Sequence, residues 1–310
     1  MKQQSLKSLV LAITAGSLVA CGSADGGSDS GAPKLTGQLA TDSVESAARS
    51  GAMVGAGVQV GNTGNSSMTD AIGSLGDTDG SSSVDQRSLV QPKNQTANVP
   101  CELSGQISLT GSESSSSVSM TFVQCMDADQ TYMNGDLSMA FSEGANESIA
   151  ISANYNAFTV TEVSGDSVYL DGDFRFVIED LLTNAGVSMT SNRFEARTTQ
   201  SGVTESVVLD DYSMNFSGSQ YNFDFYITGD EGTFHIWTEG NLQVNSFGAQ
   251  SGQLYIEGEN AKLAVTLTNT DQTPMAALAL DTDKDGTADL TGEMTQAEFF
   301  ADEDVLSGSL

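Results

Sequence analysis

Four aspartates near the C-terminus are the residues of this chain best suited to binding a metal ion. They lie in the sequence DTDKDGTAD as Asp281, Asp283, Asp285 and Asp289. A hard cation such as calcium takes six to eight oxygen ligands, and alternate carboxylates on a tight loop converge on one point. The glycine after the third aspartate permits the sharp turn that this convergence needs. The spacing therefore predicts a calcium loop.

The pattern D-x-D-x-D-G-x-x-D resembles the calcium loops of thrombospondin type 3 repeats and the first nine positions of an EF-hand loop. This resemblance implies that the four aspartates contribute side-chain oxygens and that Thr287 contributes its backbone carbonyl. The chain departs from the EF-hand at the twelfth position, where Gly292 replaces the bidentate glutamate and Glu293 follows one place late. We therefore expect a weak structural site with an affinity of roughly 0.1–1 mM. The alternative is an acidic turn between two strands, because Asp-Gly is a common turn dipeptide.

The N-terminus carries a second recognisable pattern. Lys2 and Lys7 accompany an apolar run over residues 9–19, which is too short to span a bilayer and ends in the sequence LVAC at Cys21. This order of charge, apolar run, small residues and cysteine resembles the lipobox of bacterial lipoproteins. The resemblance implies that residues 1–20 are a signal peptide and that Cys21 is lipidated. A lipid on Cys21 would hold the chain on a membrane without a transmembrane helix.

The residue after the lipobox cysteine is Gly22 and not an aspartate. By resemblance to lipoprotein sorting in enteric bacteria, this predicts the outer membrane, with the body facing the periplasm or the cell surface. The chain carries 41 acidic and 11 basic side chains, a net charge of −30, and loss of the signal peptide removes two lysines to give −32. Such a surface repels polyanions, which excludes nucleic acid as a partner.

The two cysteines that remain are Cys101 and Cys125. In an oxidising periplasm they are expected to form a disulfide, because their spacing excludes a CxxC redox or zinc site. In the chain-entropy account, a loop of this length adds roughly 3 kcal/mol to the free energy of unfolding.

Composition divides the rest of the chain. Residues 21–35 predict a lipidated flexible tether, residues 36–98 a weakly structured and partly helical leader, and residues 99–310 an antiparallel β domain. From Cys101 onward, short alternating stretches are bounded by Gly, Asn, Asp or Ser. They predict a mainly β fold, either a single large curved antiparallel sheet or a barrel-like meander, with short helices expected at 177–186 and 294–306.

A weak internal repeat runs through this β domain, which resembles no characterised family. Its shared feature is a glycine, usually with apolar residues two positions before and after it: Gly105, Gly135, Gly172, Gly240, Gly258 and Gly292. Four of these glycines have an aromatic three residues earlier: Tyr132, Tyr169, Trp237 and Tyr255. At period two the aromatic would lie on the opposite sheet face from the glycine. Glycines inside strands predict bends or bulges, and Phe158 and Tyr212 are expected at equivalent positions, with Cys125 as a third.

No catalytic set stands out. The chain has one histidine, His235, within an alternating stretch typical of a strand. We therefore expect a non-enzymatic, membrane-anchored lipoprotein that acts as a structural or interaction module for a protein partner. One alternative is a carrier or binder of a hydrophobic ligand in a concave sheet, and another is a hydrolase with an unrecognised carboxylate pair.

Overall fold

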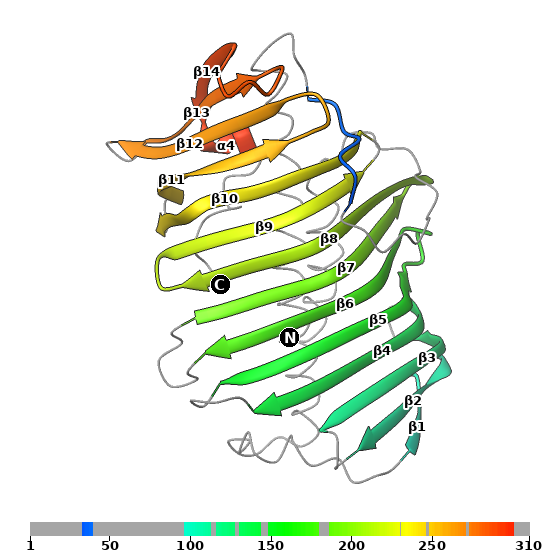
Figure 1. Cartoon of the computed structure of the whole chain (residues 1–310). Coiled ribbons are helices and arrows are strands. Elements are labelled where there is room, and N and C mark those ends of the chain that lie inside the picture. Colours follow the sequence, from blue (N-terminus) through cyan, green and yellow to red (C-terminus); the bar gives the residue numbers. More distant parts are fainter. Residues whose placement is uncertain are drawn as a thin grey trace. The chain divides into compact units, whose positions relative to one another are not determined.

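The computed structural model describes residues 33–39, 96–112, 116–127, 130–143, 148–179, 186–229, 231–245, 248–270 and 273–300. These residues form one open antiparallel sheet whose strands lie in chain order, which confirms the predicted fold class (Figure 1). The predicted signal peptide, Cys21 and most of the leader lie outside the described residues. Within the described residues, no helix is long and apolar enough to span a membrane.

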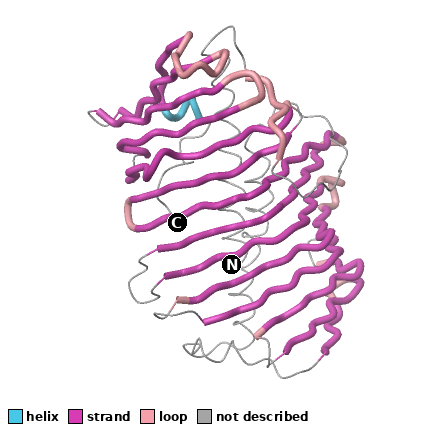
Figure 2. The backbone as a smooth tube through the Cα atoms, viewed as in Figure 1, coloured by secondary structure: helices cyan, strands magenta, loops and turns pink. Residues whose placement is uncertain are grey.

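The described part of the chain contains fourteen strands and one short helix, α4 (Gln296–Phe300) (Figure 2). The strands are β1 (Thr96–Pro100), β2 (Ser104–Ser112), β3 (Ser117–Met126), β4 (Tyr132–Glu143), β5 (Ile149–Thr161), β6 (Ser167–Glu179), β7 (Gly186–Gln200), β8 (Val203–Ser217), β9 (Gln220–Gly229), β10 (Gly232–Asn245), β11 (Gly248–Glu257), β12 (Lys262–Thr270), β13 (Thr273–Asp281) and β14 (Leu290–Thr295). Among the described residues, the first strand begins at Thr96, three residues before position 99.

The described residues divide into two compact units. Unit 1 holds β1 to β6 and the segment Phe194–Thr204, whereas unit 2 holds residues 33–39, the segment Gly186–Arg193, and the chain from Glu205 onward. The division falls inside β7, where the alternation of buried side chains slips from Ser191 to Phe194.

Unit 2 owes its stability to one apolar sheet face. Leu209, Phe225, Ile236, Leu254 and Leu263, from successive strands, are each 0 % exposed. Their neighbours along each strand point to the other face, as the period of two requires. Burying a side chain of this size contributes about 1.5–3 kcal/mol, so this face is the main source of the stability of unit 2.

Unit 1 has an aromatic core of its own. The ring of Phe194 lies 4.4 Å from that of Phe174 and 5.7 Å from that of Tyr155, centroid to centroid. Burial raises the pKa of Tyr155 to about 12, so its hydroxyl stays protonated in this apolar setting.

Three strands carry a β-bulge at equivalent points of the repeat. The bulged residues Gln124 in β3, Ala157 in β5 and Asp211 in β8 have φ values of 46°, 48° and 50°. The residues that follow them are those expected to be equivalent: Cys125, Phe158 and Tyr212. The sequence repeat therefore encodes a repeated bulge, a device that bends and twists a strand.

The side chain of the residue before a repeat glycine accepts a hydrogen bond from the bulged residue of the neighbouring strand. The backbone N–H of Gln124 donates to Oδ1 of Asn134 at 2.8 Å, and that of Ala157 donates to Oδ1 of Asp171 at 2.9 Å. A bulge leaves a backbone group out of the regular ladder, and these side chains provide its partner. The Asn-Gly and Asp-Gly pairs of β4 and β6 thus have a defined role inside the sheet.

Gly135 shows why the repeat needs a glycine. Its φ is +100°, and a Cβ at this position would lie 2.3 Å from the carbonyl oxygen of Ala157. Both the backbone conformation and the close approach of β5 exclude a side chain there.

The disulfide prediction is confirmed. Cys101, just after β1, is bonded to Cys125 in β3, with the Cα atoms 5.5 Å apart. The helix expected at 177–186 is wrong for Val177–Glu179, which complete β6, where Val177 and Ile178 pair with Ala150 and Ile149 of β5. Of the helix expected at 294–306, only Gln296–Phe300 is helical within the described residues.

Candidate metal site

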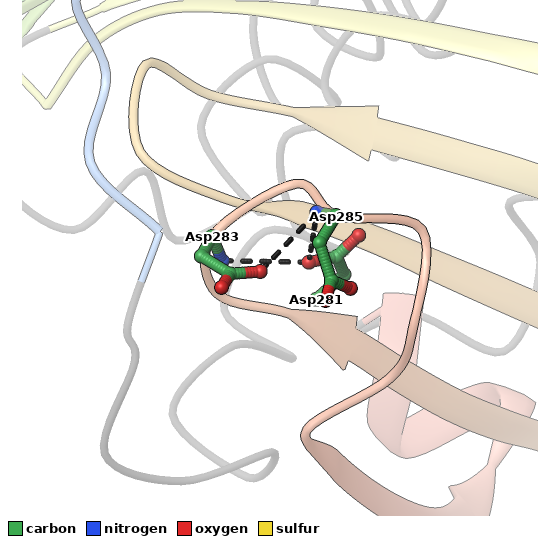
Figure 3. A group of neighbouring side chains, drawn as sticks. All are labelled: Asp281, Asp283 and Asp285. Carbon is green, nitrogen blue, oxygen red and sulfur yellow. Dashed lines mark hydrogen bonds between the residues drawn. The ribbon is translucent and has the colours of Figure 1, made fainter.

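The loop between β13 and β14 gathers three carboxylates at one point (Figure 3). Asp281 is the last residue of β13 and is 8 % exposed, whereas Asp283 and Asp285 lie exposed on the loop. Each offers one oxygen, and the three oxygens lie within 4.8 Å of one another. They are close enough to bind a metal ion together, as the sequence spacing predicts.

Backbone N–H groups of the loop orient the carboxylate of Asp281. Its Oδ2 accepts a hydrogen bond from Gly286 at 2.8 Å, and its Oδ1 accepts from Asp285 at 3.2 Å and from Asp283 at 3.4 Å. Desolvation raises the pKa of Asp281, but the loop N–H donors outweigh it and the net shift is downward. Asp281 is therefore a fixed, ionised carboxylate around which the loop folds.

The conformation of the loop backbone follows from its residue types. Gly286 has a φ of +91°, a value that side chains disfavour and glycine adopts readily. The N–H of Asp285 also donates to Oδ1 of Asp283 at 3.2 Å, and the N–H of Thr287 donates to Oδ1 of Asp285 at 2.7 Å. Each aspartate thus turns the chain by bonding a backbone group two residues further on, as in Asx turns.

Asp289 lies at the base of the loop and not in the group of three. Its Oδ2 accepts from the backbone N–H of Thr282 at 2.8 Å and from the Thr282 hydroxyl at 2.6 Å. These hydrogen bonds, led by that of the hydroxyl, lower the pKa of Asp289. The N–H of Asp289 donates to the carbonyl of Leu280 at 2.9 Å, which closes the loop.

Lys284 connects this loop to the neighbouring turn between β11 and β12. Its Nζ lies 2.9 Å from Oε1 of Glu257 and 2.6 Å from the carbonyl oxygen of Gly258. The ammonium group is thus directed to this turn.

Negative charges on carboxylates held this close repel one another, and a bound cation would relieve that repulsion.

Sequence reasoning missed a stack of side chains on the exposed face of unit 2. The Tyr226 ring lies 4.4 Å from that of His235, which lies 4.3 Å from Trp237, and Trp237 lies 5.2 Å from Tyr255. The Nζ of Lys262 sits 4.2 Å from the Tyr255 centroid. The only sequence signal was that Trp237 and Tyr255 both precede repeat glycines by three residues; they pair directly across β10 and β11.

This stack connects three neighbouring strands: Tyr226 of β9 pairs with His235 of β10, and Trp237, two residues further along β10, pairs with Tyr255 of β11. The interplanar angles between consecutive rings are 12°, 24° and 26°, so each ring covers the face of the next. The Nε2 of His235 also lies 2.7 Å from Oδ1 of Asp224. His235 therefore has a structural role in its strand, because neighbouring side chains stabilise a sheet through such pairs.

In comparisons with known proteins, no family model, curated protein or solved structure matches this chain. The proposed function accordingly rests on the sequence and the geometry of this chain.

Proposed function

We propose that this protein is a non-enzymatic, membrane-anchored lipoprotein whose β-sheet serves as a structural or interaction module, with a structural calcium ion in the Asp loop. The observation that supports this most directly is the convergence of Asp281, Asp283 and Asp285 on one point. Calcium is the proposed ion because it accepts carboxylate, carbonyl and water oxygens in a variable geometry.

The loop offers the oxygens that such an ion needs. Asp281 is held by several backbone N–H groups, whereas Asp283 and Asp285 are exposed and each accepts one backbone hydrogen bond at Oδ1, which leaves Oδ2 for an ion. The carbonyl of Thr287 and the second carboxylate oxygen of Asp289 are the proposed additional ligands, and water would complete the shell. Magnesium fits less well, because it demands near-ideal octahedral geometry.

The proposed location follows from the sequence. A lipid on Cys21 would attach the chain to a membrane, and the lipobox with Gly22 supports the outer membrane. The disulfide between Cys101 and Cys125 fits an oxidising compartment. The strongly acidic composition supports a protein partner or the membrane anchor over nucleic acid.

The apolar face of unit 2 bears on the choice between a structural module and a lipid carrier. Its central side chains, such as Phe225 and Ile236, are already 0 % exposed. A carrier would need apolar surface that a ligand can cover, so this packing supports the structural module. A hydrolase would need two carboxylates at catalytic separation in a cleft.

The calcium proposal is tested by thermal unfolding of the wild type, Asp283→Ala and Glu231→Ala in calcium, magnesium or chelator. Binding to the folded state alone raises its stability by mass action, so the wild-type melting temperature should rise with calcium above about 1 mM. Asp283→Ala should lose most of this rise. Glu231 is an exposed acid in the turn between β9 and β10, and its removal should leave the rise intact.

An acidic turn without a specific ion would behave differently. Calcium and magnesium would then act equally by screening charge, and Asp283→Ala would respond to calcium as Glu231→Ala does. That pattern would overturn the calcium site.

A further inference from the structure

Residues 33–39 lie as an extended strap on unit 2, far from it in sequence. The N–H of Gly37 donates to the carbonyl of Thr233 at 3.1 Å, and the carbonyl of Gly37 accepts from the N–H of Glu259 at 2.6 Å. The strap thus bonds through its backbone to the start of β10 and to the turn between β11 and β12.

Side chains fix the register of the strap. Oδ1 of Asn260 accepts from the N–H of Leu39 at 2.8 Å, and its Nδ2 donates to the Leu39 carbonyl at 3.0 Å. The hydroxyl of Thr36 accepts from the N–H of Thr233 at 3.1 Å. Leu39 is 3 % exposed, so the strap also buries apolar surface.

Three glycines let the strap approach this closely. A Cβ on Gly37 would lie 2.4 Å from the Phe234 ring, and a Cβ on Gly232 would lie 2.5 Å from the nitrogen of Gly37. A Cβ on Gly258 would likewise lie 2.5 Å from the Gly37 carbonyl oxygen. The contact therefore depends on the absence of a side chain at these three glycines. A side chain added at one of them should displace the strap.

The strap lies at one end of the strands of unit 2. Antiparallel strands alternate in direction, so the turns β9–β10, β11–β12 and β13–β14 share one end of the sheet. The strap contacts the first two of these turns, and the Asp loop is the third (Figure 1). The turn β8–β9, at residues 218–219, belongs to the opposite end. The ten residues of β9 separate the two ends by about 33 Å.

We propose that the docked strap determines which end of unit 2 faces the membrane. This inference rests on the proposed lipid anchor at Cys21. Eleven residues, rich in Gly and Ser, lie between Cys21 and Pro33. Such a flexible chain has a root-mean-square length of about 20 Å, which is shorter than the distance of about 33 Å between the two ends of unit 2. Without the docked strap, 74 residues would lie between Cys21 and Thr96 in unit 1, and the same relation gives about 50 Å. The strap end, which includes the Asp loop, is therefore held next to the bilayer surface.

The test uses the lipidated full-length chain on phospholipid vesicles that contain an acceptor dye on the lipid head group. A donor dye is attached through Glu231→Cys at the strap end or through Ser219→Cys at the opposite end, both exposed positions. Energy transfer should be greater from position 231 than from position 219. Equal transfer, or greater transfer from position 219, would overturn the proposed orientation.

Two strap variants make the test specific. Gly37→Val should displace the strap and reduce transfer from position 231 at least twofold. The matched variant Gln38→Ala removes one exposed side-chain hydrogen bond to Glu259 and should leave the energy transfer from position 231 unchanged. Thermal melts establish that both variants fold. A folded Gly37→Val with wild-type transfer would contradict the proposal. If Gly37→Val does not fold, the comparison of positions 231 and 219 in the otherwise wild-type chain still decides the orientation.

Flotation separates the two hypotheses. If the lipidated chain does not float with vesicles while Cys21→Ala behaves in the same way, the anchor fails and the orientation fails with it. If the chain floats but the two labels give equal transfer, only the orientation fails.

Discussion

The backbone N–H of Ala157 donates a hydrogen bond to the carboxylate of Asp171 across two strands, at 2.9 Å. Ala157 is the bulged residue of β5 and has a φ of 48°. Asp171 stands immediately before Gly172 in β6. One side chain thus compensates for the irregular backbone of the adjacent strand.

Replacing Asp171 tests this relationship. Asp171→Ala leaves the N–H of Ala157 without this acceptor and should lower the free energy of unfolding by about 1 kcal/mol. Asp171→Asn keeps an oxygen at the same position and should cost less than half as much. Urea unfolding of the three proteins measures the difference. Equal losses in both variants would show that the charge, and not the hydrogen bond, matters.

Two glycines with similar backbone angles should respond differently to alanine. Gly165→Ala places a Cβ in open space at a φ of +91°, which should cost about 1 kcal/mol from the backbone alone. Gly135→Ala adds a clash with the Ala157 carbonyl, and its cost should exceed that of Gly165→Ala by about 1–3 kcal/mol. Denaturant midpoints measure both, and a smaller loss at position 135 would contradict the tight bulge packing.

Gln296 should be the most sensitive polar residue of α4. Its buried amide accepts from the N–H of Ala249 at 3.1 Å and donates to the carbonyl of Ala249 at 2.8 Å. Gln296→Ala leaves these backbone groups unsatisfied and should cost about 1–3 kcal/mol. The comparison is Thr295→Ala, which removes the helix cap that Thr295 forms with Glu298 and should cost about 1 kcal/mol. A larger loss from Thr295→Ala would contradict this ranking.

The base of the Asp loop should lose stability in acid. Hydrogen bonds from Thr282 lower the pKa of Asp289 below its ordinary value in the folded state. The ionised form is thus favoured by folding, so its contribution is complete above the unfolded pKa of about 4 and disappears as the pH falls through the lower folded pKa.

Thermal melts between pH 7 and pH 2 test this prediction without added metal. Asp289→Ala should show a weaker fall in melting temperature below pH 4 than the wild type. Thr282→Val keeps the carboxylate but removes its hydroxyl donor, and it should lie between the two. Identical acid profiles for all three proteins would rule out this contribution.

The repeated bulge was predictable because it leaves a local signature. A glycine preceded by Asn or Asp, with apolar residues at period two, marks β4 and β6, and the equivalence of Phe158 and Tyr212 follows the same pattern. β7 leaves a weaker signature, because the buried positions on that strand include Ser191, Ala196 and Thr198. These small or polar residues weaken the alternation of apolar and polar side chains on which a strand prediction depends.

The strap contacts could not be predicted in the same way. Leu39 and Asn260 are separated by 221 positions in sequence, and nothing local in either segment specifies the other. The Asp loop, in contrast, could be predicted from local sequence, because its ligand spacing and its turn glycine are contained in nine residues. The sequence therefore predicted the grouping of Asp281, Asp283 and Asp285, but it did not predict that Asp289 lies at the base of the loop.

The stacked position of Trp237 gives the protein an internal optical reporter. It is the only tryptophan in the chain, and its ring lies between those of His235 and Tyr255. Its intrinsic emission therefore reports on β9 to β11 of unit 2 and carries no signal from unit 1. Far-ultraviolet circular dichroism reports on strands of both units. An offset between the two unfolding curves would reveal that the units lose structure separately, without any label or added cofactor.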